Sequence, residues 1–161
     1  MVNFEPKPTY NVEDLRQIVA LLRAPGGGPW DGAQTHESLR RNFIEEAYEV
    51  AEAIDEASPA HLKEELGDVL LQVLFHASIE EDAGRFNLDE VADGICKKLI
   101  YRHPHVFGQG GEGTPDSWEA LKRQEKGQTT ETETLQAVAK SLPGLWRAEK
   151  IQTKAARAGF E

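Results

Sequence analysis

The sequence predicts an all-α protein with a four-helix-bundle-like core and an additional C-terminal helix. Three observations predict this class. Apolar residues recur at helical spacing, capping residues precede several of these stripes, and no segment alternates as a β-strand does. The length of 161 residues suits one compact domain, which we expect to cover residues 1–161.

The first helix is expected over residues 11–23. Asn11 and Asp14 form a capping signal at its start, and the segment APGGGPWDG that follows is expected to break the helix and form a mobile loop. The apolar stripe of this helix consists of Leu15, Ile18, Val19 and Leu22.

The next two helices are expected to pair as antiparallel neighbours, because only a short link separates them. One runs from about Thr35 to Ala57, and the other begins at the Ser58–Pro59 capping signal and stops near Gly84. The expected buried stripes are Leu39, Phe43, Ala47, Val50 and Ile54 on the first, and Leu62, Leu66, Val69, Val73, Leu74 and Ala77 on the second.

The rest of the chain predicts three more helices. One starts at Asn87, boxed with Glu90, and ends at Pro104. After the glycine-rich segment GQGGEGTPDSW, a short helix opens at Thr114–Pro115. Residues 126–134 are expected to be an exposed or disordered link, and 135–161 a C-terminal segment with a helix over about 143–158.

The charge balance narrows the class of partner. Eighteen basic against 28 acidic residues give a net charge of −10, which argues against nucleic acid as a partner. No apolar run is long enough for a membrane span, so no membrane partner is expected. A single cysteine, Cys96, fits a reducing compartment, and we expect a cytoplasmic protein.

The strongest chemical signal is an acidic strip on the two paired helices. Residues 42–62 contain six carboxylates and no Lys or Arg. Helical spacing places Glu46 and Glu49 on one strip, and Glu65 and Asp68 on the facing helix. Four carboxylates that converge without a basic residue need a cation. Because all the ligands are oxygens, Mg²⁺ is expected, with Mn²⁺ as a substitute.

Two other interpretations of these residues are weaker. A single acidic run is usually a solvated helix face, but two runs beside one apolar seam favour a site. A di-iron carboxylate site needs Glu-x-x-His on two helices, and no Glu here has His three residues later. The spacing of Cys96, His103 and His105 matches no common zinc site.

The pattern E-E-x-x-E at 45–49 followed by E-x-x-D at 65–68 resembles the signature of the MazG family of all-α nucleoside triphosphate pyrophosphohydrolases. The segments GPWDGAQTHESLR, EELGDVLLQVLFHA, KLIYRHPHVFG and LPGLWRAEKIQTKAARAGF extend the resemblance in order over nearly the whole chain. The resemblance implies hydrolysis between the α- and β-phosphates to a nucleoside monophosphate and pyrophosphate, which would cleanse the nucleotide pool.

The resemblance also implies roles for individual residues. The metal ligands would be Glu46, Glu49, Glu65 and Asp68, and Glu45 would orient or deprotonate the attacking water, unless it is a solvated acid outside the reaction. Lys98 and Arg102 lie one helical turn apart and can reach one phosphate group together. The remaining substrate-binding positions implied are Trp118, which would stack on a base unless it is a core residue, and Lys122. A homodimer is also implied.

The sequence departs from the family pattern at two points. Gly28 stands where family members often have Cys, and the chain ends at Glu161 where many members continue into a second copy of the domain. Both a single-domain member and an N-terminal half are therefore open expectations. The alternative functions are a catalytically inactive nucleotide- or metal-binding regulatory domain and a helical interaction module with an incidental acidic face.

Overall fold

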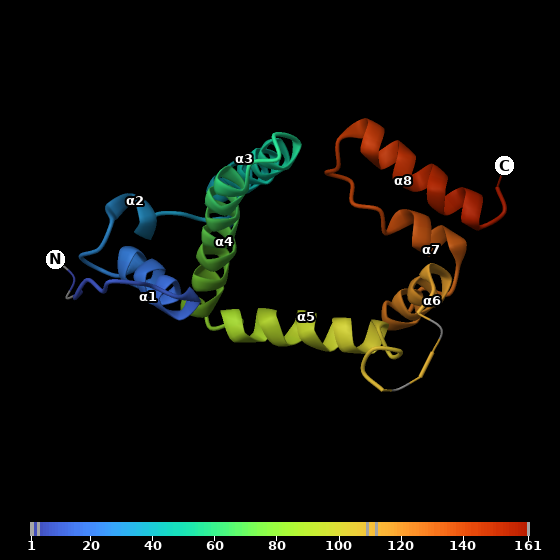
Figure 1. Cartoon of the computed structure of the whole chain (residues 1–161), viewed down its shortest axis with the longest axis horizontal. Coiled ribbons are helices and arrows are strands. Elements are labelled where there is room, and N and C mark those ends of the chain that lie inside the picture. The colour runs from blue at the N-terminus through green and yellow to red at the C-terminus, as the bar shows by residue number, and fades with distance from the viewer. Residues whose placement is uncertain (1, 3, 109, 112, 161) are drawn as a thin grey trace. The chain divides into compact units, whose positions relative to one another are not determined.

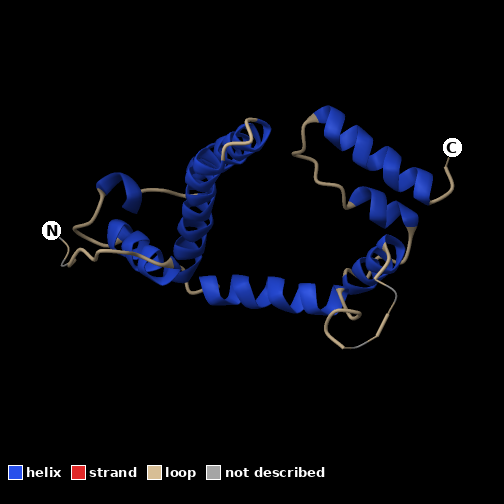
Figure 2. Ribbon diagram, in the orientation of Figure 1, coloured by secondary structure: helices blue, strands red, loops and turns tan. Residues whose placement is uncertain are grey.

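The computed structural model describes residues 2, 4–108, 110–111 and 113–160. Over this part of the chain it contains eight helices and no strand, which confirms the all-α class (Figure 2). Two positions of the glycine-rich loop considered above, Gln109 and Glu112, lie outside the described residues. In the described ranges, no helix is both long enough and apolar enough to cross a bilayer.

The chain forms two compact units, Met1–Gly94 and Ile95–Glu161. In the first unit α3 and α4 form an antiparallel hairpin, and α1 packs against α4 (Figure 1). The helix α5 begins in the first unit and ends in the second. The bounds are α1 Val12–Arg23, α2 Pro29–Gly32, α3 His36–Asp55, α4 Pro59–Asp82, α5 Leu88–Arg102, α6 Pro115–Glu125, α7 Glu131–Gln136 and α8 Gly144–Arg157.

Capping residues set the helix starts as predicted. The Asn11 side chain accepts from the backbone N–H of Asp14, whose carboxylate accepts from the Asn11 N–H in return. Ser58 caps α4 in front of Pro59. The Asn87–Glu90 box precedes α5 and Thr114 caps α6 in the same manner. Each cap satisfies backbone donors that the first turn leaves unpaired.

The core of the first unit joins α1, α3 and α4. Its most buried side chains are Val19 of α1, Leu39 of α3, and Leu74 and Phe75 of α4. Arg23 ties the end of α1 to α4, because its guanidinium donates to Ser78 Oγ at 3.1 Å and to Asp82 Oδ2 at 2.7 Å. These contacts hold α4 in place as the support for the acidic residues.

Three predictions of burial were wrong, and one of them concerns Ala47 of α3, which is exposed. Ile54 of α3 is 58% exposed, and Leu66 of α4 is 51% exposed. The neighbouring residues Ala53 and Glu65 are buried instead. The reason is that the α3–α4 seam at this end of the hairpin is built from polar residues, so the inner strip is rotated by one residue, about 100°, from the apolar stripe.

Two short helices occupy segments that the sequence had assigned to loops. Residues 131–136 form α7, and residues 131–134 of it were expected as part of an exposed or disordered link. A capping box of Thr130 and Glu133 starts this helix, and Thr134 is buried within it. The four-residue α2 lies within the segment expected as a mobile loop, with Pro29 in its first turn. Local hydrogen bonds thus order both segments despite their lack of apolar stripes.

A group of polar side chains connects the start of α3 with the last turns of α4. His36 Nδ1 lies 2.6 Å from His76 Nδ1, and the two rings stack at 4.9 Å. His36 Nε2 also contacts the buried carboxylate of Glu80, which Arg85 binds with two hydrogen bonds. Only one hydrogen can lie between the two Nδ1 atoms, so at least one of the rings is neutral.

We expect this group to make the folded state less stable as the pH is lowered. Burial and the charge of His36 lower the pKa of His76 from 6.5, so the unfolded state takes up a proton more readily as the solution is acidified. The free energy of unfolding should therefore decrease between about pH 7.5 and 5.5. Urea titrations at several pH values should show a smaller decrease for His76→Gln than for wild type. His105→Gln, which removes an exposed histidine, is the control, and an unchanged slope in His76→Gln would contradict the assignment.

Candidate metal centre

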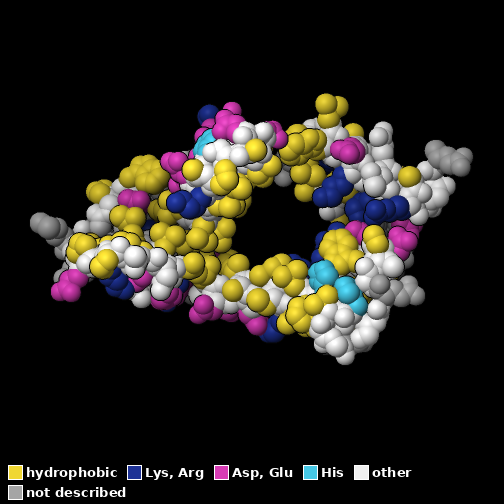
Figure 3. Space-filling model, in the orientation of Figure 1, with side chains coloured by type: hydrophobic (Ala, Val, Ile, Leu, Met, Phe, Trp, Pro, Cys, Tyr) yellow, Lys and Arg dark blue, Asp and Glu magenta, His cyan; other side chains and the backbone are white. Residues whose placement is uncertain are grey.

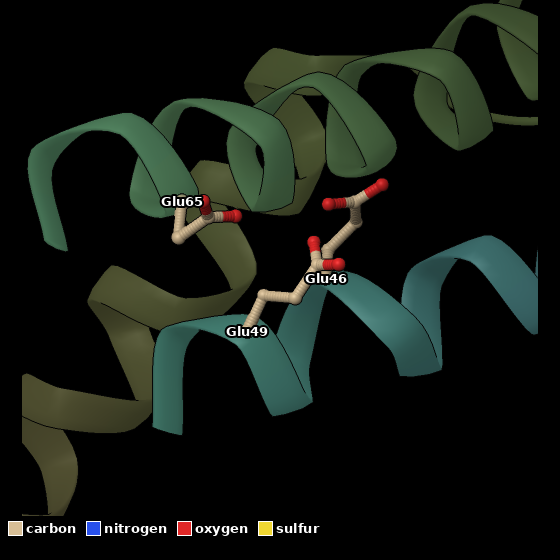
Figure 4. Close-up of side chains that lie close together, drawn as sticks. All are labelled: Glu46, Glu49 and Glu65. Carbon is tan, nitrogen blue, oxygen red and sulfur yellow. The ribbon is translucent and has the colours of Figure 1, made fainter. Parts of the chain in front are cut away.

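Three of the predicted acidic ligands meet between α3 and α4. Glu46 and Glu49 project from α3 and Glu65 from α4, and one carboxylate oxygen of each lies within 4.8 Å of the others. Figure 4 shows the three carboxylates turned into the space between the two helices. Their burial differs: Glu65 is buried, Glu46 is half-buried and Glu49 is exposed. The group is thus open to solvent on one side.

The electrostatics of this group are unfavourable to three ionised carboxylates. Burial raises the pKa of Glu46, and it is raised further by a hydrogen bond that protonated Glu46 donates to the Glu49 carboxylate and by the charges of Glu49 and Asp68. Burial also raises the pKa of Glu65, with Glu49 as the next cause. A group that resists losing its protons is one that a divalent cation would stabilise, because the cation replaces those protons.

Asp68, the fourth predicted ligand, lies at the edge of the group. It is not among the carboxylates within 4.8 Å, but it is close enough for its charge to raise the pKa of both Glu46 and Glu65. One turn further along α4, Gln72 is buried, and its Oε1 has no donor among the described residues. A buried oxygen without a partner is costly, and a hydrated cation nearby would satisfy it.

The donor set therefore fits a hard divalent cation. Every available ligand atom is a carboxylate or amide oxygen, which suits magnesium, manganese or calcium rather than zinc or copper. The open side leaves coordination positions for water or a substrate oxygen. Within the described residues, this is the group of acidic, histidine or cysteine side chains whose geometry suits a metal ion.

Glu45, the candidate for activating water, has a partner that the sequence reasoning missed. Its Oε1 accepts a hydrogen bond from Arg41 Nε at 2.7 Å, and the carboxylate is 50% exposed. The i, i+4 spacing of the two residues was the available signal. It was overlooked because Arg41 stands just before the acidic stretch. Glu45 thus has a basic neighbour one turn away on α3.

His61 of α4 is a further residue at this group that the sequence analysis did not single out. Its Nε2 lies 3.1 Å from Glu65 Oε1, and its Nδ1 lies 2.8 Å from Glu56 Oε2. The hydrogen bond with Glu56 raises the pKa of His61. His61 thus contacts Glu65 from within α4, and Glu46 and Glu49 lie near Glu65 on the α3 side. The i, i+4 spacing of His61 and Glu65 again carried the signal.

The predicted substrate-binding residues lie in the second unit. Arg102 is buried, its Nε donates to Glu125 Oε2 at 2.7 Å, and its guanidinium lies 5.5 Å from the ring centre of Trp118. Lys122 Nζ lies 4.8 Å from the same ring. The structure thus brings three of the four residues together, whereas Lys98 is exposed on α5. Trp118 is half-buried, and two cations lie close to its ring.

The comparisons with known proteins agree with this geometry. Residues 34–107, which hold α3, α4 and α5, match the family model of the MazG nucleotide pyrophosphohydrolase domain. The chain is 46% identical over 149 residues to the nucleoside triphosphate pyrophosphohydrolase/pyrophosphatase MazG of Thermotoga maritima, covering 92% of the chain and 58% of that protein. It is 37% identical over 155 residues to the nucleoside triphosphate pyrophosphohydrolase of Escherichia coli, covering 93% of the chain and 59% of that protein.

A third relative is the protein YabN of Bacillus subtilis, 51% identical over 142 residues, with 86% of the chain and 29% of YabN covered. The chain thus spans between 29% and 59% of the length of these three relatives. The matched family model includes all of the acidic positions described above. Residues 34–107 of the chain therefore carry a MazG nucleotide pyrophosphohydrolase domain.

Proposed function

We propose that the chain is a metal-dependent nucleoside triphosphate pyrophosphohydrolase that cleaves between the α- and β-phosphates. The products are a nucleoside monophosphate and pyrophosphate, and the role is to remove surplus or non-standard nucleotides. The observation that carries this proposal is the convergence of Glu46, Glu49 and Glu65 within 4.8 Å. The names of the relatives from Thermotoga maritima and Escherichia coli support it.

In this proposal Glu46, Glu49, Glu65 and Asp68 hold Mg²⁺, with Mn²⁺ as a substitute. The ion, when bound, offsets negative charge on a phosphate oxygen and assists the nucleophile. His61 holds Glu65 in position through the 3.1 Å contact.

Glu45 is the proposed acceptor of the water proton in this reaction. Its carboxylate is half-exposed, and water can therefore reach it. Before it accepts a proton, Glu45 must exchange its hydrogen bond with Arg41 for one with the water, which the exposure of both side chains permits.

Lys98, Arg102, Trp118 and Lys122 are the proposed contacts to the nucleotide. Lys122 and Arg102 supply positive charge for phosphate oxygens. The Trp118 ring already contacts both cations, so a base that stacks on it competes with them for the ring. Substrate preference among bases would then rest on contacts other than this ring.

The reaction has a direct test. Incubation with each common ribo- and deoxynucleoside triphosphate and Mg²⁺, followed by phosphorus NMR, should give monophosphate and pyrophosphate, and EDTA should abolish both. Diphosphate with orthophosphate would contradict the proposed cleavage position. Nucleotide binding without any product would instead support the second candidate function.

That second candidate is a catalytically inactive nucleotide- or metal-binding regulatory domain. The observation that favours it is the pairing of Glu45 with Arg41 at 2.7 Å, because a carboxylate oxygen that already accepts a hydrogen bond from a guanidinium is not free to accept one from water. The two functions differ in Arg41→Ala. Release of Glu45 should maintain or raise turnover in an enzyme, whereas an inactive domain stays without product.

We also propose a homodimer, supported by apolar side chains that this single chain leaves exposed. On the α3–α4 hairpin these are Ile44, Ile54 and Leu66, and on α5 they are Val91, Ile95 and Leu99. Stripes of this kind at helical spacing suit burial against a second copy. A cytoplasmic location is proposed as well, because the exposed Cys96 thiol is free.

A further inference from the structure

The second unit contains a cavity of about 390 Å³. Of its lining residues, the proposed function assigns a role only to Lys122. The cavity lies between α6 and α8, and its volume falls within the range of about 300–1,000 Å³ typical of ligand pockets. Its charged lining consists of Glu119 and Lys122 from α6 with Glu149, Lys150, Lys154 and Arg157 from α8. Figure 3 shows Lys and Arg side chains gathered beside α8.

The lining carries more positive than negative charge. Four cations face two carboxylates, in a chain whose net charge is −10. On α8 the basic residues recur at positions 150, 154 and 157, so they share the face that a packed helix would normally fill with apolar residues. This arrangement concentrates positive charge in one concave place.

The basic side chains that line the cavity outnumber the carboxylates that pair with them. Glu119 alone lies near both Lys122, at 3.5 Å, and Lys154, at 3.7 Å, and both ammonium groups are less than one quarter exposed. Burial lowers the pKa of Lys122, and the charge of Lys154 contributes in the same direction. In the part of the chain that the structure describes, no carboxylate pairs with Lys150 or Arg157.

In a neighbouring cavity the positive and negative charges are balanced. It measures about 340 Å³ and shares Glu119, Lys154 and Arg157 with the first. Its further cation, Arg123, is paired with Glu131 at 2.7 Å. Asp116 also lines this cavity, so its three carboxylates balance its three cations, whereas the lining of the α6–α8 cavity keeps an excess of positive charge.

We infer that the α6–α8 cavity binds a diphosphate group, either free pyrophosphate or the terminal phosphates of a nucleoside triphosphate. A diphosphate presents several anionic oxygens over a short length, and Lys150, Lys154 and Arg157 offer donors over two turns of one helix. Lys122 faces them from α6. Because binding here needs no acidic cluster, it is expected to occur without a divalent cation.

The test is calorimetric titration of the full chain with sodium pyrophosphate in EDTA at low salt. Wild type should bind in a saturable manner, and Lys154→Gln and Arg157→Gln should each weaken binding by about tenfold or more, as loss of a charged hydrogen bond does. Lys140→Gln removes an exposed lysine of the same unit and is the matched control, with unchanged affinity. Circular dichroism checks the fold of each variant, and Arg157, exposed in the last turn of α8, is the substitution least able to disturb it.

The outcomes separate this inference from the proposed reaction. Equal binding of pyrophosphate and of ATP in EDTA would identify the diphosphate group itself as what is recognised, and tighter binding of ATP would identify the nucleotide as the source. Orthophosphate or AMP binding as tightly as pyrophosphate would overturn the inference, as would equal affinities of Lys154→Gln, Arg157→Gln and Lys140→Gln. If wild type hydrolyses the nucleotide and Glu49→Gln stops hydrolysis but keeps pyrophosphate binding in EDTA, both proposals stand. Absence of turnover in wild type with pyrophosphate binding intact refutes the reaction alone.

Discussion

Glu49→Gln should abolish nucleoside triphosphate turnover and leave the metal-free chain at least as stable as wild type. The amide keeps the size of the side chain but removes one negative charge from the group with Glu46 and Glu65. Loss of a ligand should weaken Mn²⁺ binding by more than about 100-fold, since residues that merely support ligands already contribute 10- to 100-fold. Turnover should fall at least as far.

The gain in stability has a separate cause. In wild type the charge of Glu49 helps to raise the pKa of both Glu46 and Glu65, which shows that the carboxylates repel one another. Removing like charge at helical spacing relieves about 0.2–0.5 kcal/mol per pair. A residue retained for folding would give the opposite sign, because its replacement would lower the melting temperature.

The measurements are turnover by phosphorus NMR, Mn²⁺ titration by calorimetry, and thermal unfolding with EDTA or with Mg²⁺. Mg²⁺ should raise the melting temperature of wild type, because a ligand that binds only the folded state stabilises it. It should not do so for Glu49→Gln. Glu52→Gln, an exposed acid one turn further along α3, is the matched control and should retain both properties. Full activity of Glu49→Gln, or an undiminished response to Mg²⁺, would contradict the metal assignment.

Much of the first unit could be predicted because its signals are local. Capping residues such as Asn11, Ser58 and Asn87 mark helix starts within four residues of sequence, and the three-residue link between α3 and α4 forces an antiparallel pair. Once these two helices face each other, the positions of Glu46, Glu49 and Glu65 follow from the helical repeat. The convergence of the acids was therefore accessible from spacing alone.

The sequence reasoning failed where a residue's partner is distant or where two local signals compete. The group of His36, His76 and Glu80 depends on residues 40 and 44 positions apart, and no local pattern announces it. Ile54 and Leu66 were assigned to the core because apolar residues usually are buried, whereas the seam here is acidic. The hydrophobic periodicity thus indicated the helix correctly and its inner face incorrectly.

The division of the chain also limits what spacing can say about the substrate. The acidic residues belong to the unit Met1–Gly94, and Lys98, Arg102, Trp118 and Lys122 belong to Ile95–Glu161. Helical spacing describes neighbours within a helix or a hairpin. It says nothing about two units joined by one helix, α5, so the shared role of these two groups rests on the chemistry proposed for each.

Leu74→Ala should destabilise the chain strongly. Leu74 is only 2% exposed and lies in the cluster with Val19 of α1 and Leu39 of α3. Truncation of a fully buried leucine costs about 2–5 kcal/mol, because it removes apolar contacts and leaves a cavity. Against a typical total of about 5–15 kcal/mol, this loss is large enough to unfold a substantial fraction of the chain on mild heating.

Leu66→Ala is the matched control, since it makes the same truncation on the same helix at a side chain that is 51% exposed. In a monomer its cost should stay within about 0.5 kcal/mol, as for other surface substitutions. In the proposed dimer Leu66 is buried against the second copy, so its cost should grow with protein concentration. Urea unfolding at two concentrations, followed by circular dichroism, measures all three proteins. A cost for Leu74→Ala no greater than that for Leu66→Ala would mean that α1, α3 and α4 do not pack around Leu74, and the support for the acidic cluster would have to lie elsewhere.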